Sequence, residues 1–419
     1  MLRQRAESGA PPPARLRRNL RTTLWLSFFQ VFLLIIPIAV PFFQSKGLSM
    51  QEVFSLQAVF SLAVLLLEVP SGVLADQLGR RLTLVWGTVF CGLGSSVLMV
   101  AQDYWGLLAF ELLLAVSSSL VSGADIAMAY DSELALGKPA EQQGSVVGRL
   151  YASRNLSEAL SAVLLSALLL WCTVHEVLLV QALISWLPLI FALQLVEPPR
   201  LHHDGDAEQL PLRHALSHLW GHSRILRFCF LALCLWSLTT FNAVWLLQKL
   251  WSEQGIELVH FGYLWAGLSL VTAVSGRFAD RIEATLGVSM TLLVIGLLPV
   301  GGYLLLDQLG IAGGLVAGAA FFAARGVGLV ILRDALNRRT PSAYRATANS
   351  LASFGFRAAF VVTGPFVGYG FDLWGMRSVL LLLAAVSALI ALAILLPLAL
   401  AARRPALPVA VDPVEAADA

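Results

Sequence analysis

Charged residues are scarce in this sequence: only 13% of its 419 residues are Asp, Glu, Lys or Arg, whereas 58% are hydrophobic. A water-soluble domain of that composition would expose large contiguous apolar patches, so the composition excludes a soluble globular protein. The scarcity is also local. Five stretches carry no charge at all, namely 22–45, 82–102, 228–248, 284–306 and 378–402. Each is about as long as the ~20 residues that a helix needs to cross a membrane.

Other apolar stretches reach spanning length if one or two charges are allowed inside them. They are 53–73, 106–130, 145–170, 177–196, 261–276, 310–332 and 346–369. Together, the two sets predict an all-α polytopic membrane protein with about twelve transmembrane helices.

Motifs for several other functions are missing. The chain has no Gly-x-x-x-x-Gly-Lys-Ser/Thr loop, so it carries no nucleotide-binding loop through which ATP could drive transport. It also has no His-Glu-x-x-His or Gly-x-Ser-x-Gly motif. The four cysteines lie in or beside apolar stretches without metal-ligand spacing, which indicates packing residues. We expect no cofactor, no metal and no nucleic-acid partner.

Positive charge is distributed unevenly between the two sides of the predicted membrane. Of the 28 Lys and Arg residues, only Lys46, Lys249 and Arg377 fall on one side, and only Arg154, Arg325 and Arg357 fall inside spans. The others follow the positive-inside rule if both termini are cytoplasmic. We therefore expect a multi-pass protein of the cell inner (plasma) membrane, monomeric in the lipid bilayer.

The two halves of the chain repeat one another. The stretch "SGVLADQLGRRL" at 71–82 is similar to "SGRFADRIEATL" at 275–286, and "SGADIAMAYD" at 122–131 to "RGVGLVILRD" at 325–334, at nearly the same offset. Two pseudo-symmetric bundles of about six helices would place a substrate path between them. The predicted parts are a basic tail (1–20), a first bundle (21–196), a cytoplasmic linker with an amphipathic helix (197–224), a second bundle (225–402) and a disordered tail (403–419).

A charged turn interrupts the apolar sequence at 70–82. We expect one helix to end near Gly72 and the next to begin near Leu82, with Gly79 in the turn and Arg80 and Arg81 at the inner leaflet. Asp76 would act as a latch between the halves, and Asp280 repeats it in the second half. The alternative is an ordinary charged loop.

The stretch "GVLADQLGRRL" resembles the signature between helices 2 and 3 of the major facilitator superfamily, and the similarity extends over about residues 20–400. The resemblance implies twelve helices, alternating access and secondary active transport. It also implies that Asp76 faces the start of helix 11 near Ala346, and that Arg80 reaches Asp131. The Gly-Pro motif that many antiporters carry on helix 5 is absent.

Several ionisable residues lie inside predicted spans, where each is costly to insert and usually has a partner or a function. Glu158 is the first candidate for a proton carrier, with Arg154, Asp125 and Glu68 as further proton-coupling candidates. The alternatives are a static pair of Arg154 with Glu158 or Asp125, and an inner-gate role for Glu68 and Asp125. Glu111, about one turn from the outer face, would be hydrated.

The substrate would be held by polar, aromatic and cationic residues near mid-span. Arg325 and Arg357 would suit an anionic group, although Arg325 could instead extend to the inner leaflet. Gln30, Trp236 and Asn242 complete the candidate binding set, and the alternative for Gln30 and Asn242 is hydrogen bonding between helices.

Three histidines of the linker, His214, His218 and His222, would share one helical face. Zinc binding and an amphipathic helix on the inner leaflet are the two interpretations, and we favour the helix.

The leading functional prediction is a proton-coupled antiporter for efflux of a small organic molecule such as a drug, siderophore or metabolite. The alternative is a proton-coupled symporter that takes up a small anionic nutrient. An intramembrane hydrolase is a remote third possibility. The stretches "AYDS" and "SGAD" resemble the two aspartate motifs of intramembrane aspartyl proteases, but here both lie on one helix, whereas that chemistry needs two facing helices. A transport-inactive receptor or scaffold is disfavoured by Glu158 and the mid-span arginines.

Overall fold

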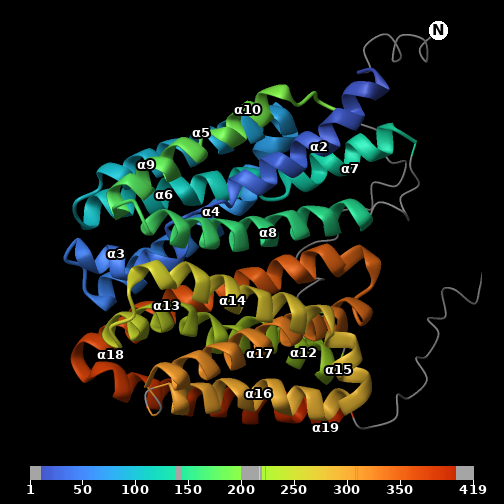
Figure 1. Cartoon of the computed structure of the whole chain (residues 1–419). Helices are drawn as coiled ribbons and strands as arrows, with labels where there is room; N and C mark the ends of the chain where they lie inside the picture. The colour runs from blue at the N-terminus through green and yellow to red at the C-terminus, as the bar shows by residue number, and fades with distance from the viewer. Residues whose placement is uncertain are drawn as a thin grey trace, which may run out of the picture.

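The computed structural model describes residues 11–137, 144–199 and 217–402, apart from 218, 222, 307 and 309. In this part of the chain, regular structure is helical throughout and no strand occurs. Figure 1 shows two bundles side by side, the first from blue to green and the second from yellow-green to red.

The first bundle contains three uninterrupted long helices and three helices that are broken into two pieces. Its elements are α2 (Pro13–Gln30), η1 (Ile36–Ile38), α3 (Ala39–Ser45), α4 (Met50–Leu78), α5 (Arg80–Val100), α6 (Tyr104–Val121), α7 (Ala124–Ala135), α8 (Gly144–Leu169), α9 (Val174–Ile184) and α10 (Leu187–Gln194). The breaks fall at Val31–Ile35, at Ser122–Gly123 and at Ser185–Trp186.

The second bundle has longer continuous helices. Its elements are α12 (Arg224–Leu231), η3 (Ala232–Trp236), α13 (Ser237–Glu253), α14 (Leu258–Arg277), α15 (Ala279–Leu286), α16 (Val288–Leu305), α17 (Gly310–Arg338), α18 (Ser342–Ile390), η4 (Ala391–Leu395) and α19 (Leu396–Ala402). The element α18 comprises two helices that meet at a turn, and the turn is at Gly375, whose φ is 74°.

The structure supports a polytopic membrane protein. Nine helical segments of the described residues are long and apolar enough to span a membrane, one of them covering 347–402. The predicted spans 22–45 and 145–170 coincide with α2–α3 and with α8, which are not among the nine. The count of twelve therefore stays a prediction, as do the domain boundaries.

One helix boundary differs from the expectation. Instead of ending near Gly72, α4 continues to Leu78, and α5 begins at Arg80 rather than near Leu82. The charged turn is thus a single residue, Gly79, with φ of 92°. A residue without Cβ adopts this conformation at little cost, so two helices can adjoin directly. Asp76 consequently lies on the last turns of a helix rather than in a loop.

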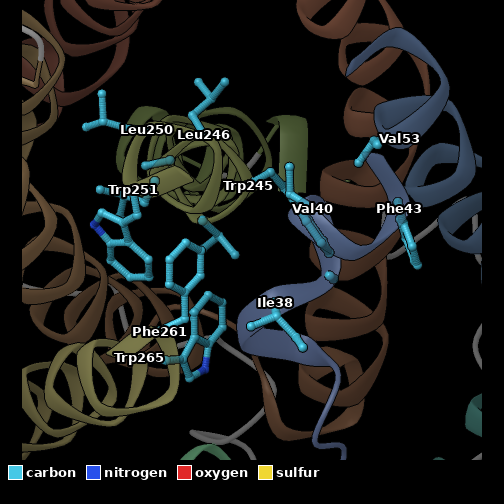
Figure 2. Packing of buried hydrophobic residues seen from close by; sticks show 14 of the residues in the cluster. Ile38, Val40, Phe43, Val53, Trp245, Leu246, Leu250, Trp251, Phe261 and Trp265 are labelled. Atoms are coloured by element: carbon cyan, nitrogen blue, oxygen red, sulfur yellow. The ribbon is translucent and has the colours of Figure 1, made fainter. Parts of the chain in front are cut away.

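The two ends of the molecule differ in how closely the bundles meet. We call the end where α4 begins and Asp372 lies the Asp372 end (left in Figure 1), and the end where α4 meets α5 the Asp76 end. Towards the Asp372 end, one buried apolar cluster draws residues from both bundles, including Ile38 and Val40 from the first and Trp245 and Trp265 from the second (Figure 2). The bundles are therefore packed together at this end.

Polar contacts reinforce that packing. The carboxylate of Asp372 in α18 accepts hydrogen bonds from the backbone N–H groups of Met50 (3.1 Å) and Gln51 (2.8 Å) at the start of α4. Gln248 of α13 accepts from the Val40 N–H (3.0 Å) and donates to the Ile36 carbonyl (3.1 Å). Each contact satisfies backbone groups that the helix ends or breaks of the first bundle would leave unpaired.

Candidate functional site

The turn at the Asp76 end is fixed inside the first bundle. Arg80 forms an ion pair with Asp131 of α7, and its Nη1 donates to the Ala127 carbonyl at 3.2 Å. The carboxylate of Glu197 accepts hydrogen bonds from the backbone N–H groups of Arg80 and Arg81, both at 2.8 Å. An anion at a helix N-terminus is favourable, so the first residue of the predicted linker is anchored to this turn.

Asp76 itself is exposed and, within the described ranges, has no hydrogen bond or ion pair. Gly72 also lies in open space on α4. The side chain of Ala346 is outside the described part. Among the described residues Asp76 makes no contact with the start of α18, and the latch remains a proposal for another conformation.

The second half repeats the turn only partly. Asp280 is exposed on α15, and Asp334 pairs with Arg338 of its own helix at 2.6 Å. In the aligned repeats Ala284 stands where Arg80 stands in the first half, so the arginine–aspartate pair of the first bundle has no counterpart. Glu283 lies beside these acids. Burial and the nearby charge of Asp334 raise the pKa of Glu283 above its ordinary value.

Inside the first bundle, Asp125 is fully buried and well satisfied. It forms an ion pair with Arg154 of α8, and it accepts from the hydroxyl of Ser27 at 2.6 Å and from the Ile126 N–H at 2.8 Å. These contacts join α2, α7 and α8. This is the static pair that the sequence left open as an alternative, and it engages Arg154.

Glu158, one turn further along α8, faces the other bundle. The indole Nε1 of Trp265 in α14 donates to Glu158 Oε1 at 3.3 Å. The Glu158 side chain stays exposed despite this contact. It also lies near enough to Arg325 of α17 for the two charges to interact. A carboxyl group between the bundles thus meets a donor and a cation from the second half.

The two mid-span arginines of the second bundle each interact with an acid of the first. Arg325 interacts with Glu158, and Arg357 of α18 interacts electrostatically with Glu68 of α4. The guanidinium of Arg325 also lies over the ring of Phe241, 5.8 Å from its centroid. Both arginines therefore have a counter-charge, and in each case it comes from the other half of the sequence.

Aromatic rings surround this charged group. Phe241 of α13 makes edge contacts with Phe356 and Phe360 of α18, at centroid distances of 5.3 and 4.8 Å. Trp265 makes another with Phe322 of α17, at 6.1 Å. Trp265, Phe322 and Phe360 are buried, so these rings pack directly beside the exposed carboxylate of Glu158 and the cation of Arg325.

The remaining substrate candidates lie in buried positions. Gln30 donates to the Ser117 hydroxyl at 2.7 Å, and its Oε1 has no partner. Asn242 is buried, with an unpaired Oδ1. Trp236 is buried in the second bundle, where its Nε1 donates to the Ile295 carbonyl at 3.3 Å. The structure thus brings Glu158 and Arg325 together, while Trp236 packs inside the second bundle.

Sequence reasoning missed Trp265, Phe241, Glu197 and Asp372. Only Trp265 gave a usable signal, as a tryptophan in the middle of a predicted span. Within the described ranges no group of three or more His, Cys, Asp or Glu could hold a metal. The linker histidines His202, His203, His214, His218 and His222 lie outside the described residues.

Comparisons with known proteins identify the class. A model of the Major Facilitator Superfamily matches residues 22–332. The chain belongs to this superfamily and is a multi-pass membrane transporter of the secondary type, not an enzyme. A comparison with curated proteins gave no match.

Solved transporter structures share the fold. The nucleoside transporter NupG has a TM-score of 0.75 at 12% identity, with 93% of this chain and 100% of that chain covered. A bacterial homolog of the human lysosomal transporter Spinster, inward-facing and unoccupied, has a TM-score of 0.69 at 15% identity, with 95% and 100% covered. A D-xylose–proton symporter has a TM-score of 0.64 at 15% identity, with 90% and 96% covered.

Proposed function

We propose that the protein is a proton-coupled antiporter that exports a small amphiphilic organic molecule by alternating access. The supporting observation is the position of Glu158, exposed between the bundles, in contact with Trp265 and within the field of Arg325. Protonation of Glu158 removes its attraction for Arg325 and so changes the energy of holding the bundles together. A bias of about 1.4 kcal/mol changes the ratio of two conformations tenfold.

Binding of substrate and of proton would then compete at the same place. The deprotonated carboxylate and the rings of Trp265, Phe322 and Phe241 receive an amphiphilic molecule that enters from the Asp76 end. A proton that reaches Glu158 from the other side displaces this molecule. The positive-inside distribution supports a cytoplasmic location for the Asp76 end and both termini of a protein in the inner membrane. The conformation described here would be the one that loads substrate for export.

The test uses purified protein in sealed liposomes with an imposed pH gradient and a panel of fluorescent amphiphilic dyes. Wild-type protein should accumulate a dye against its gradient. Glu158→Gln should abolish accumulation but retain dye exchange at equal pH, because the neutral amide cannot exchange a proton. Glu257→Gln, an exposed glutamate at the Asp372 end, is the matched control. Gradient-driven accumulation by Glu158→Gln at the wild-type level would refute the assignment.

Uptake of a small anionic nutrient is the second candidate, favoured by Arg325 and Arg357 at mid-span. The same liposomes separate the two functions, because a symporter moves its substrate in the direction of proton flow and an antiporter moves it in the opposite direction. Arg325→Gln would prevent uptake of an anion. In an antiporter the same variant should weaken the coupling to the proton, because Glu158 loses the cation that it attracts, but exchange of a cationic dye at equal pH should be retained.

A further inference from the structure

A second carboxyl group of the first bundle is buried and is not used in the proposed function. Glu111 of α6 is only 3% exposed, and its Oε1 accepts a 2.6 Å hydrogen bond from the Nε2 of Gln57 in α4. It lies two helical turns, or about 10 Å, from the start of α6 at the Asp372 end. This position differs from the hydrated one expected from the sequence.

The charged and titratable groups on the helices packed against α6 either have other partners or lie far from Glu111 along their helices. On α4, Glu52 closes its own capping box with Ser49, Glu68 interacts with Arg357, and Asp76 is at the far end.

On α5, Arg80 and Arg81 are also at the far end, and Cys91 faces the Gln30 carbonyl. On α7, the acids are Asp125, Asp131 and Glu133, all beyond the break at Gly123. Lys46, a cation of the Asp372 end, donates to Gln102 at 2.9 Å.

Within the described ranges, Glu111 therefore has a neutral amide as its partner and no cation in contact. An ionised carboxylate without a counter-charge is costly in a buried apolar site, so the group holds its proton instead. The hydrogen bond from Gln57 remains compatible with the protonated form, because Oε1 can still accept.

We propose that Glu111 is a second proton-binding site, and that the Asp372 end closes only when Glu111 is protonated. This inference rests on the proposed proton-coupled transport and adds a separate residue to it. The connection runs through α4. One turn before Gln57, Phe54 packs against Phe360 of α18 with a centroid distance of 6.4 Å. At the start of α4, the Met50 carbonyl lies so close to Gly368 that a Cβ there would come within 2.5 Å of it.

When α18 moves away from α4, water gains access to the stretch of α4 that carries Gln57, and Glu111 can ionise. Renewed closure would bury the carboxylate without a partner, so it requires a proton from the Asp372 side. In an exporter this step makes the return of the protein to the conformation described here depend on proton uptake by Glu111 from the Asp372 side.

The experiment measures closure directly, without a transport substrate. Spin labels at His175→Cys and Glu257→Cys, both exposed at the Asp372 end, in a Cys172→Ser background report the distance between the bundles in lipid nanodiscs. For the wild type, the closed-to-open ratio should fall by up to about tenfold per pH unit above a midpoint, because one proton is released on opening. Glu111→Gln, which stays neutral and keeps a hydrogen-bond acceptor, should remain closed over the whole pH range.

A second variant guards against misfolding. Gln57→Leu removes the donor that favours the ionised form, so the midpoint should move to higher pH while the slope is retained. A purely structural role for the pair would change thermal stability and leave the midpoint in place. The same pH-dependent opening in Glu111→Gln as in the wild type would overturn the inference. Glu158→Gln with the same labels should keep the pH-dependent opening of the Asp372 end. The experiment therefore tests the role of Glu111 separately from the proposed role of Glu158 in coupled transport.

Discussion

Arg154 pairs with Asp125 on the neighbouring helix α7, although Glu158 lies one turn further along its own helix α8. Asp125 is fully buried and draws a further hydrogen bond from Ser27 of α2. The pair therefore joins three helices of the first bundle and leaves Glu158 facing the second. Asp125 therefore has the structural role in this group, and Glu158 keeps the proposed coupling role.

Asp125→Asn should destabilise the protein strongly. Loss of the carboxylate leaves the Arg154 guanidinium without its counter-charge, and breaking one side of a buried pair costs about 3–5 kcal/mol. Thermal unfolding in detergent measures the effect. Ser27→Ala is the control, because it removes one hydrogen bond to the same carboxylate and should cost about 1.5–3 kcal/mol. Equal melting temperatures for Asp125→Asn and the wild type would show that the pair contributes nothing to stability.

Gly262→Ala should prevent closure at the Asp372 end. A Cβ at this position would lie 2.0 Å from the Ala162 carbonyl oxygen and 2.5 Å from Ser166 Oγ, so α14 could not approach α8. We expect the distance between labels at His175→Cys and Glu257→Cys to lengthen and transport to fall at least about tenfold. Gly267→Ala on the same helix meets nothing within 4 Å and should behave like the wild type. A closed distance distribution in Gly262→Ala would disprove the steric argument.

Asp372→Asn should weaken the same closure by a smaller amount. The ionised carboxylate caps the N-terminus of α4 from the opposite bundle, an interaction of about 0.3–1 kcal/mol at low ionic strength. The closed-to-open ratio should fall roughly two- to fivefold in low salt, with a smaller difference in high salt. Glu257→Gln supplies the control, since Glu257 makes no side-chain cap with α14. For this comparison the second label is placed at His260→Cys, which is also exposed on α14. A salt-independent effect would contradict the electrostatic origin.

Asp76→Asn should favour the conformation described here. In this conformation Asp76 is exposed, whereas the proposed latch places it at the N-terminus of α18 when the Asp76 end closes. Loss of that anion would shift the population roughly two- to fivefold towards opening of the Asp76 end. Distances between labels across this end provide the measurement, and the exposed neighbour Gln77→Ala is the control. Identical distributions for Asp76→Asn and the wild type would remove the latch.

The fold was largely predictable because charge-free stretches can only be accommodated as membrane helices, and "GVLADQLGRRL" indicated the junction between α4 and α5. The helix boundaries at this junction were not predictable, because α4 continues through Pro70 to Leu78 and stops only at Gly79. Periodicity identifies the helix, but the residue that can adopt positive φ determines where it ends.

The site was predictable only within each helix. Spacing shows that Arg154 and Glu158 share a face of α8, but it carries no information on how α7 is rotated towards them, and Asp125 forms the pair. The proximity of Glu158 to Arg325, and of Glu68 to Arg357, depends on how two bundles dock. Glu111 illustrates the same point, since its burial depends on α4 and not on its own neighbours in the sequence.

Glu283 should make the stability of the second bundle depend on pH. Burial and the charge of Asp334 raise its pKa in the folded protein, so the folded state holds this proton more tightly than the unfolded chain. Its stabilising contribution is complete below the ordinary pKa of a glutamate and is lost as pH rises through the raised pKa. Melting temperature should therefore fall over this interval, and Glu283→Gln should flatten the dependence and melt higher at neutral pH. Glu257→Gln should retain the wild-type profile, and a profile of Glu283→Gln that is indistinguishable from it would show that another group titrates.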